Sequence, residues 1–197
     1  MSENVVWHRG SVTPSDRLDA TGGEGVTVWM TGLSGSGKST IAYSAEMMLV
    51  QTGRAAYTLD GDNLRHGLNS DLGFAAVDRS ENVRRVGEVA RLMADAGLVV
   101  LVPVISPFAS DRKMVREAHE EAGLAFVEVF VDASLEVCER RDPKGLYARA
   151  RAGEIEDMTG IDSPYEAPEN PDLRLDSEGT SAEILAAQIV EAVGAGS

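Results

Sequence analysis

A complete phosphate-binding motif, G-x-x-x-x-G-K-[ST], lies near the amino end of the chain, where residues 32–39 read GLSGSGKS. Such a loop works between a strand and a helix, because backbone N–H groups and the helix N-terminus then converge on a phosphate. Residues 26–31 are β-prone, and residues 40–51 favour a helix that stops at Gly53. An accidental Gly/Ser turn is the alternative, and the two flanking elements argue against it. The motif therefore predicts a strand, a phosphate-binding loop and a helix in succession.

Each part of the motif has an expected task. Its glycines let the backbone wrap closely around an anion. Lys38 is expected to reach the β- and γ-phosphates of a nucleotide, and the Ser39 hydroxyl is expected to hold Mg²⁺. The residues expected to bind the nucleotide in this loop are Gly32, Leu33, Ser34, Gly35, Ser36, Gly37, Lys38, Ser39 and Thr40.

Beyond the motif, β-prone and helix-prone runs alternate along the chain. Strands are predicted at 26–31, 55–59, 98–105, 125–131 and 172–175. Helices are predicted at 40–51, 80–96, 111–122, 135–141, 145–152 and 181–193. This alternation predicts a three-layer α/β fold, with a central parallel sheet of about five strands and helices on both faces. Ligands of such sheets lie beyond the carboxyl ends of the strands.

The sequence predicts a single domain over residues 25–197. Residues 1–24 are polar and indicate an N-terminal arm or mobile leader, in which residues 5–7 (VVW) could dock on a surface. The stretch 153–171 is acidic and contains three prolines. It is too long and polar for a plain connector, so a lid over the site is expected at about 145–171.

Composition narrows the range of partners. No apolar run approaches the roughly 20 residues that cross a bilayer, and no secretory signal is visible. The formal net charge of −14 argues against nucleic acid and against an anionic membrane. The single cysteine, Cys138, cannot form an internal disulfide. A reducing cytoplasm is therefore the expected compartment.

Two carboxylates after the second predicted strand are candidates for proton transfer. Asp60 and Asp62 flank a glycine, and carboxylates beside a phosphate loop suit proton acceptance and Mg²⁺ handling. Asp62 is expected to face the acceptor hydroxyl and to contribute to the metal site, with Asp60 as its supporting neighbour. The alternative is that Asp62 simply caps a short helix at 63–67, and the two roles can coexist.

Arginines that follow this segment are candidates for a second anion site. Arg79 and Asn82 lie at the start of a long predicted helix, where the helix dipole favours an anion. A guanidinium fork suits phosphate or sulfate oxygens, and Arg65 is a further candidate. Arg84 and Arg85 are expected to be solvated surface charges.

Four further positions could carry chemistry. Phe74, in a loop, could stack on a base or belong to the core. Ser106 precedes a proline, and it could hydrogen-bond a phosphate, accept a phosphoryl group transiently or serve only as a turn residue. Arg140 and Lys144 belong to a group of three cations before the expected lid and are expected to contact phosphate, whereas Arg141 can be a surface residue.

Together these segments resemble the adenylylsulfate (APS) kinase family, in the family's order and across nearly the whole chain. They are GLSGSGKST at 32–40, LDGDNLR at 59–65, LGF at 72–74, DRSEN at 78–82, ISPF at 105–108, DPKGLY at 142–147 and TGID at 159–162. The resemblance implies a P-loop kinase-type fold with a lid segment. It also implies transfer of the γ-phosphate of ATP, with Mg²⁺, to the 3′-hydroxyl of adenosine 5′-phosphosulfate (APS). Relatives are usually homodimers, and association with ATP sulfurylase is a further expectation.

The resemblance also assigns residues. It implies an APS pocket lined by Arg65, Phe74, Arg79, Asn82, Ile105 and Lys144. Ser106 corresponds to the family's phosphoserine, although a phosphate loop already aligns donor and acceptor for direct transfer, so hydrogen bonding by Ser106 is sufficient. Many members carry a Gly-Phe pair in the lid, whose ring covers the APS adenine. Residues 157–158 are Asp-Met here, and Met158 is expected to pack on the purine instead.

Three other functions compete with this interpretation. A kinase of similar fold could act on a nucleoside, shikimate or gluconate. A nucleotide-controlled switch is a second class, but no Asn-Lys-x-Asp guanine-reading sequence is present. A catalytically silent subunit attached to a sulfurylase is the third, and the intact Lys38, Ser39 and Asp62 argue against inactivity.

Overall fold

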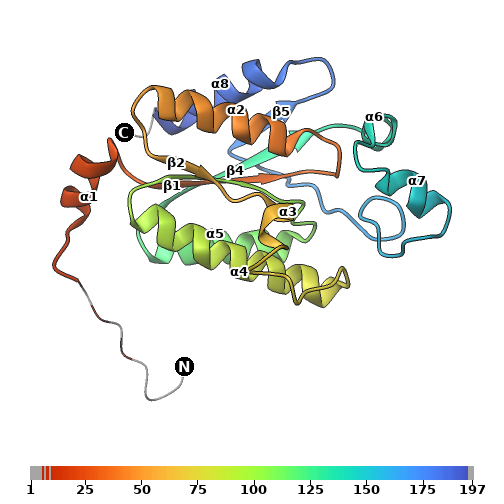
Figure 1. Ribbon diagram of the computed structural model, residues 1–197, viewed down its shortest axis with the longest axis horizontal. Helices are drawn as coiled ribbons and strands as arrows, with labels where there is room; N and C mark the ends of the chain where they lie inside the picture. The colour runs from red at the N-terminus through yellow and green to blue at the C-terminus, as the bar shows by residue number, and fades with distance from the viewer. Residues whose placement is uncertain (1–5, 7, 9, 195–197) are drawn as a thin grey trace.

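Five parallel strands form the middle layer of the structure (Figure 1), a computed structural model that describes residues 6, 8 and 10–194. Over these residues the strands are β1 Val26–Thr31, β2 Ala56–Thr58, β3 Val99–Pro103, β4 Ala125–Asp132 and β5 Leu173–Asp176. Their order is β2-β3-β1-β4-β5, and all neighbouring pairs are parallel. The predicted parallel sheet is confirmed. Because β1 is central, the loop after it opens at the middle of the carboxyl edge.

Helices cover both faces of the sheet, which confirms the three-layer α/β prediction (Figure 1). Helices α2 and α8 pack on one face, and α4 and α5 pack on the other. The helices within the described residues are α1 Pro14–Thr21, α2 Lys38–Gln51, α3 Gly61–Leu64, α4 Ala76–Asp95, α5 Ala109–Glu121, α6 Leu135–Arg141, α7 Leu146–Arg151 and α8 Ala182–Gly194. None of these helices has both the length and the apolar content that a membrane span requires.

The central strand β1 is buried along its whole length. Val28 and Met30 belong to the core beneath α2 and α8, whereas Trp29 belongs to the core beneath α4 and α5. Successive side chains of a strand point to opposite faces of the sheet. A strand that is covered on both faces therefore needs apolar residues at both its odd and its even positions. The polar Thr27 is satisfied by a hydrogen bond between its Oγ1 and Nε2 of His119 (2.9 Å).

Helix α1 occupies part of the segment where the sequence predicted a mobile leader. A capping box starts it, since Thr13 Oγ1 accepts from the N–H of Asp16 (3.2 Å) and the Asp16 carboxylate accepts from the N–H of Thr13 (2.7 Å). An ion pair between Arg17 and Asp95 (3.0 Å) ties it to α4. Residues 14–21 of the predicted arm or leader are therefore helical and contact α4. The helix buries none of its residues, so its sequence has no apolar periodicity from which a helix could be predicted.

Other boundaries differ by a few residues. Strand β3 ends at Pro103 rather than at 105, although the N–H of Val104 still donates to the Met30 carbonyl oxygen of β1 (3.1 Å). The helix predicted at 63–67 begins earlier and has Asp60 at its N-cap. Positions 5 and 7, where docking on a surface was suggested, lie outside the described residues.

A third, smaller core lies beyond the carboxyl edge of the sheet, where α6 and α7 are found (Figure 1). Its buried members include Val137 and Cys138 of α6, Tyr147 of α7 and Met158. This cluster packs the two short helices against the turn around residue 158. The segment predicted as a lid therefore has an apolar core of its own.

Candidate active site

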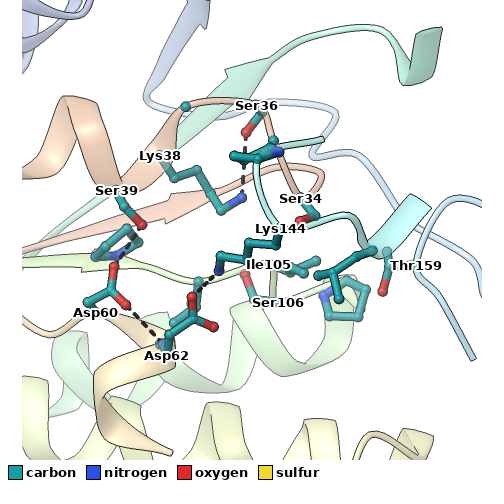
Figure 2. A pocket seen from close by; sticks show the side chains of 18 of the residues that line it. Ser34, Ser36, Lys38, Ser39, Asp60, Asp62, Ile105, Ser106, Lys144 and Thr159 are labelled. Carbon is teal, nitrogen blue, oxygen red and sulfur yellow. Dashed lines mark hydrogen bonds and ion pairs between the residues drawn. The ribbon is translucent and has the colours of Figure 1, made fainter. Parts of the chain in front are cut away.

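A cavity of about 1070 Å³ opens at the carboxyl edge of the sheet. Its walls come from the loops after β1, β2 and β3, from the start of α4 and from the segment between α6 and residue 159 (Figure 2). The predicted residues that line it are Ser34, Gly35, Ser36, Gly37, Lys38, Ser39, Thr40, Asp60, Asp62, Arg65, Phe74, Arg79, Asn82, Ile105, Ser106, Lys144 and Met158. Gly32, Leu33 and Arg140 do not line it.

The phosphate-binding loop depends on glycine at particular positions. Gly32 has φ of 152°, and a Cβ there would lie 2.5 Å from the carbonyl oxygen of Val131. Gly37 has φ of 100° and is the N-cap of α2. The first turn of α2 contains no acidic residue, so the positive end of its dipole meets the cavity uncompensated. The loop thus has the geometry of an anion site.

Lys38 is folded into the loop that carries it (Figure 2). Its Nζ donates to the carbonyl oxygens of Gly32 (2.9 Å) and Leu33 (2.7 Å), and the residue is 7% exposed. Burial disfavours the charged ammonium and lowers the pKa of Lys38 to about 8. A phosphate group in the loop would favour the charged form again, because an opposite charge raises the pKa of an amine.

Ser39 and Asp60 meet at the base of the cavity (Figure 2). Ser39 Oγ donates to Asp60 Oδ2 (2.7 Å). The other carboxylate oxygen, Oδ1, accepts from the N–H groups of Asp62 (2.9 Å) and Asn63 (3.4 Å). Asp60 is therefore the residue that caps α3, and the alternative in which Asp62 is the cap is wrong. The backbone of β2 brings the Asp60 side chain to Ser39, while Asp62 projects from the first turn of α3.

The Asp62 carboxylate forms an ion pair with the ammonium of Lys144 (Figure 2). Lys144 lies between α6 and α7, so this pair joins the small core beyond the sheet to α3 across the cavity. Both side chains remain more than half exposed. A solvated pair of this kind contributes little to stability and exchanges partners readily.

Arg65 and Phe74 form one wall of the cavity. The guanidinium carbon of Arg65 lies 4.3 Å from the centre of the Phe74 ring. Arg65 Nη1 also donates to the carbonyl oxygens of Leu72 (3.0 Å) and Gly73 (3.1 Å), and partial burial lowers the pKa of Arg65. The Phe74 ring is 64% exposed, so it is not a core residue. An exposed ring stacked on a cation is a surface on which a flat ligand can pack.

Arg79 links the start of α4 to the segment after α7. Its Nε donates to the carbonyl oxygen of Phe74 (2.7 Å), and its Nη1 donates to the hydroxyls of Thr159 (2.6 Å) and Ser163 (3.1 Å). Burial lowers the pKa of Arg79 as well. Two partly desolvated guanidinium groups thus line the same cavity as the phosphate loop.

The remaining polar residues considered in the sequence lie in three settings: beside the cavity, on the surface and in the interior. Asn82 accepts a hydrogen bond from Asn69 Nδ2 (3.0 Å) beside the cavity. Arg84 and Arg85 form surface ion pairs with Glu81, in agreement with their expected surface position. Ser106 is only 3% exposed, has φ of 40° and accepts a hydrogen bond from Trp29 Nε1 (3.1 Å).

Known proteins share this combination of features. The family model described as adenylylsulphate kinase matches residues 24–176. The chain belongs to the adenylylsulphate kinase family. It is 52% identical to the adenylyl-sulfate kinase of Staphylococcus carnosus over 190 residues, which cover 96% of this chain and 94% of that protein. A solved structure of the Mycobacterium tuberculosis APS kinase CysC in complex with AMPPNP and APS superposes with a TM-score of 0.85 at 57% identity, covering 87% of this chain and 98% of that chain.

A further member of the family is part of a longer protein. The bifunctional enzyme CysN/CysC of Mycobacterium tuberculosis is 60% identical over 174 residues, which are 88% of this chain. The chain spans 28% of the length of that relative.

Within this adenylylsulphate kinase fold, Arg141 rather than the predicted Arg140 contacts the phosphate-binding loop. Arg141 Nη1 donates to the carbonyl oxygen of Gly35 (3.3 Å), and its Nη2 donates to that of Ser177 (2.5 Å). Arg140 is exposed and lies outside the cavity lining. Neighbouring residues of a helix point about 100° apart, so only the packing of α6 decides between them. Ser177, which accepts from Arg141, lies directly after β5 at the carboxyl edge of the sheet.

Sequence reasoning also missed two contacts made by residues of the segment 145–171. The Tyr147 hydroxyl donates to the carbonyl oxygen of Ser34 (2.9 Å), and Thr159 accepts from Arg79. Both residues belong to segments that carry the family resemblance, but the resemblance assigned no function to either of them. Met158, expected to cover a purine, is 8% exposed, belongs to the third core and lines the cavity.

Proposed function

We propose that this chain is an adenylyl-sulfate kinase that transfers the γ-phosphoryl group of ATP to the 3′-hydroxyl of APS. The products are 3′-phosphoadenosine 5′-phosphosulfate and ADP. One observation carries the proposal: a single cavity joins a phosphate-binding loop to a second cationic site beside an exposed aromatic ring. Two anionic nucleotides can therefore lie end to end above one edge of the sheet.

The donor side of the cavity binds ATP. The glycines of the loop and the N-terminus of α2 surround the phosphates, and Lys38 neutralises the charge of the β- and γ-phosphates. Arg141 replaces Arg140 as the cation that lies against this loop. Its contacts with the Gly35 and Ser177 carbonyl oxygens fix the guanidinium at the entrance to the phosphate site.

The acceptor side binds APS. Arg65 and Arg79 attract the phosphosulfate, Phe74 stacks on the adenine, and Asn82, Ile105 and Met158 complete the pocket. Asp62 accepts the proton of the 3′-hydroxyl as it attacks, and Lys144 moves from the Asp62 carboxylate to the substrate anions. Positioning supplies most of the catalysis, since phosphoryl transfer needs little covalent chemistry from the protein.

The donor set beside the phosphate loop suits Mg²⁺. Ser39 and Asp60 present a hydroxyl and a carboxylate oxygen 2.7 Å apart, and Mg²⁺ prefers oxygen ligands shared with substrate phosphates. Within the described residues no cluster of three or more His, Cys, Asp or Glu side chains forms a metal cage. Bound there, Mg²⁺ would neutralise charge on the phosphates. This assigns to Asp60 the metal role that was expected of Asp62.

Three wider features complete the proposal. Residues 145–171 act as a lid, of which α7 and the turn at 157–163 contact the site. The protein works as a cytoplasmic homodimer of single-domain subunits. It associates with ATP sulfurylase, whose product is APS.

A coupled assay with MgATP and APS tests the function. ADP release should require APS, and the product should be a 3′-phosphorylated adenosine phosphosulfate identified by mass and by cleavage with a 3′-nucleotidase. Gluconate, shikimate and nucleosides should release no ADP. Binding of MgATP without saturable binding of APS, and without the bisphosphorylated product, would contradict the proposal.

Lys38→Ala should lower kcat on the order of 10²–10³-fold or more, because it removes a buried cation from the transferred phosphates. Unfolding temperature should stay near that of the unmodified protein. The matched control is Lys113→Ala, at a lysine that lies on α5 in an exposed pair with Glu117 and away from the cavity. Near-normal turnover by Lys38→Ala would show that the loop has no catalytic role.

A further inference from the structure

Ser106 is held in a backbone conformation that serine rarely adopts. Its φ of 40° lies in the left-handed region, and such residues persist only where their surroundings fix them. The Ser106 carbonyl oxygen accepts from Arg112 Nη1 (2.8 Å), and the preceding carbonyl oxygen, of Ile105, accepts from Thr31 Oγ1 (2.6 Å). Arg112 is itself 3% exposed and paired with Glu128 (2.8 Å). Both peptide groups around Ser106 are therefore fixed by buried donors.

The chain after Ser106 is fixed as well. The carbonyl oxygen of Pro107 accepts from the N–H of Glu166 (2.9 Å), and the Glu166 carboxylate accepts from the N–H of Ala109 (2.7 Å). Arg112 Nη2 donates to the Glu166 carbonyl oxygen (2.8 Å). With its backbone immobilised on both sides, Ser106 retains one important freedom, the direction of its hydroxyl proton.

Trp29 restricts that freedom. An indole N–H is a donor only, so the 3.1 Å contact makes Ser106 Oγ the acceptor. Within the described residues Trp29 is the one hydrogen-bond partner of this hydroxyl, so no carboxylate or imidazole is placed to remove its proton. Because Ser106 lines the cavity and Trp29 occupies only an acceptor position of its hydroxyl, the O–H is left to donate to a ligand there. Such a hydroxyl is suited to bind a phosphate oxygen and poorly suited to attack phosphorus.

The indole cannot contact the substrates directly. Trp29 is fully buried in the core between the sheet and helices α4 and α5, does not line the cavity and stacks on Phe126 with ring centres 6.2 Å apart. We propose that Trp29 is a positioning residue: its indole N–H makes the Ser106 hydroxyl a hydrogen-bond donor toward a phosphate oxygen of bound APS. The inference rests on the proposed kinase function.

A double-mutant cycle tests it. Trp29→Phe removes the N–H while keeping an aromatic ring, and Ser106→Ala removes the hydroxyl. Each should lower kcat/KM for APS about 10-fold, the equivalent of one hydrogen bond, without weakening MgATP binding. Trp29→Phe should cause no further loss in the Ser106→Ala background, because the indole acts through that hydroxyl. Phe126→Leu is the control, since it disturbs the same packing but keeps the N–H, and kcat/KM should stay within twofold.

A second measurement does not depend on the fold of Trp29→Phe or on activity. The chain has two tryptophans, so a ¹⁵N-labelled sample gives two indole N–H signals, and Ser106→Ala should shift the one from Trp29. An unmoved signal overturns the inference, as does an equal loss from Trp29→Phe with and without Ser106, or a Phe126→Leu loss as large as that of Trp29→Phe. If the unmodified protein makes no phosphorylated APS while the signal does shift, the proposed function fails instead.

Discussion

Lys38 is both buried and required to carry charge, and this conflict has a measurable consequence. Burial holds its pKa at about 8, against 10.5 for an ordinary lysine. A bound triphosphate stabilises the ammonium and raises the pKa again. Binding is therefore coupled to the protonation of one side chain.

We expect MgATP binding to take up protons between about pH 8 and 10 and to take up almost none near pH 6. Above pH 8 the free protein must first protonate Lys38, so affinity should fall as the pH rises. Calorimetry in two buffers of different ionisation enthalpy measures the uptake. Lys38→Met should abolish it, and uptake that persists in that variant would assign the proton to another group.

The two carboxylates after β2 have different partners, so their variants should differ in kind. Asp62→Asn should lower kcat by about 10²–10⁴-fold, the range of general base catalysis, with little change in the KM for MgATP. Asp60→Asn should instead raise the Mg²⁺ concentration needed for half-maximal rate, because Asp60 lies against Ser39. Kinetics that show the reverse pattern would exchange the two roles.

These residues also show how far sequence reasoning extends. Motif spacing placed Lys38 and Ser39 at the cavity, because the loop geometry is fixed by covalent neighbours. It did not separate Asp60 from Asp62 or Arg140 from Arg141. Each choice depends on which side chain the packing of α3 or α6 turns inward, and near neighbours of the same charge carry no such information.

Helices and strands were predictable where burial leaves a pattern. The two faces of α4 and the doubly apolar β1 are examples, since each must satisfy a core. Helix α1 was missed because local hydrogen bonds rather than burial define it. Its capping sequence, Thr13 with Asp16, has the usual Ser/Thr-x-x-Glu spacing but carries Asp in place of Glu.

Thr13→Ala should loosen α1 by about 1 kcal/mol, the usual value of an N-cap. Amide hydrogen exchange over residues 14–21 should then accelerate about fivefold if exchange follows local opening. Turnover should not change, because α1 lies away from the cavity. Ser15→Ala removes a hydroxyl two residues later without removing the cap, so equal acceleration in both variants would show that the capping box does not hold the helix.

The fold as a whole buries a titratable ring between the sheet and α5. His119 is inaccessible to solvent, and its ring nitrogens contact the Val115 carbonyl oxygen (2.8 Å) and Thr27 Oγ1 (2.9 Å). Burial lowers its pKa below the ordinary 6.5. The folded state therefore favours the neutral ring, while the unfolded chain binds a proton below pH 6.5.

The free energy of unfolding should consequently fall as the pH drops through 6.5, because the unfolded chain then binds a proton that the folded state disfavours. Denaturant titrations of the protein and of His119→Gln at both pH values isolate the effect. The variant should be less stable at pH 7.5 and less sensitive to pH. An identical pH dependence in the two proteins would show that His119 does not cause the loss of stability at low pH.

The placement of α1 determines how the protein can be handled. The helix meets the chain just before β2 and β3, where Thr21 accepts a hydrogen bond from Ala55, so it lies at the amino edge while the cavity opens at the opposite one (Figure 1). A bead, sensor chip or fluorophore linked ahead of Pro14 would leave the nucleotide entrance unobstructed. Immobilised through that end, the catalyst should accept both nucleotides as freely as it does in solution.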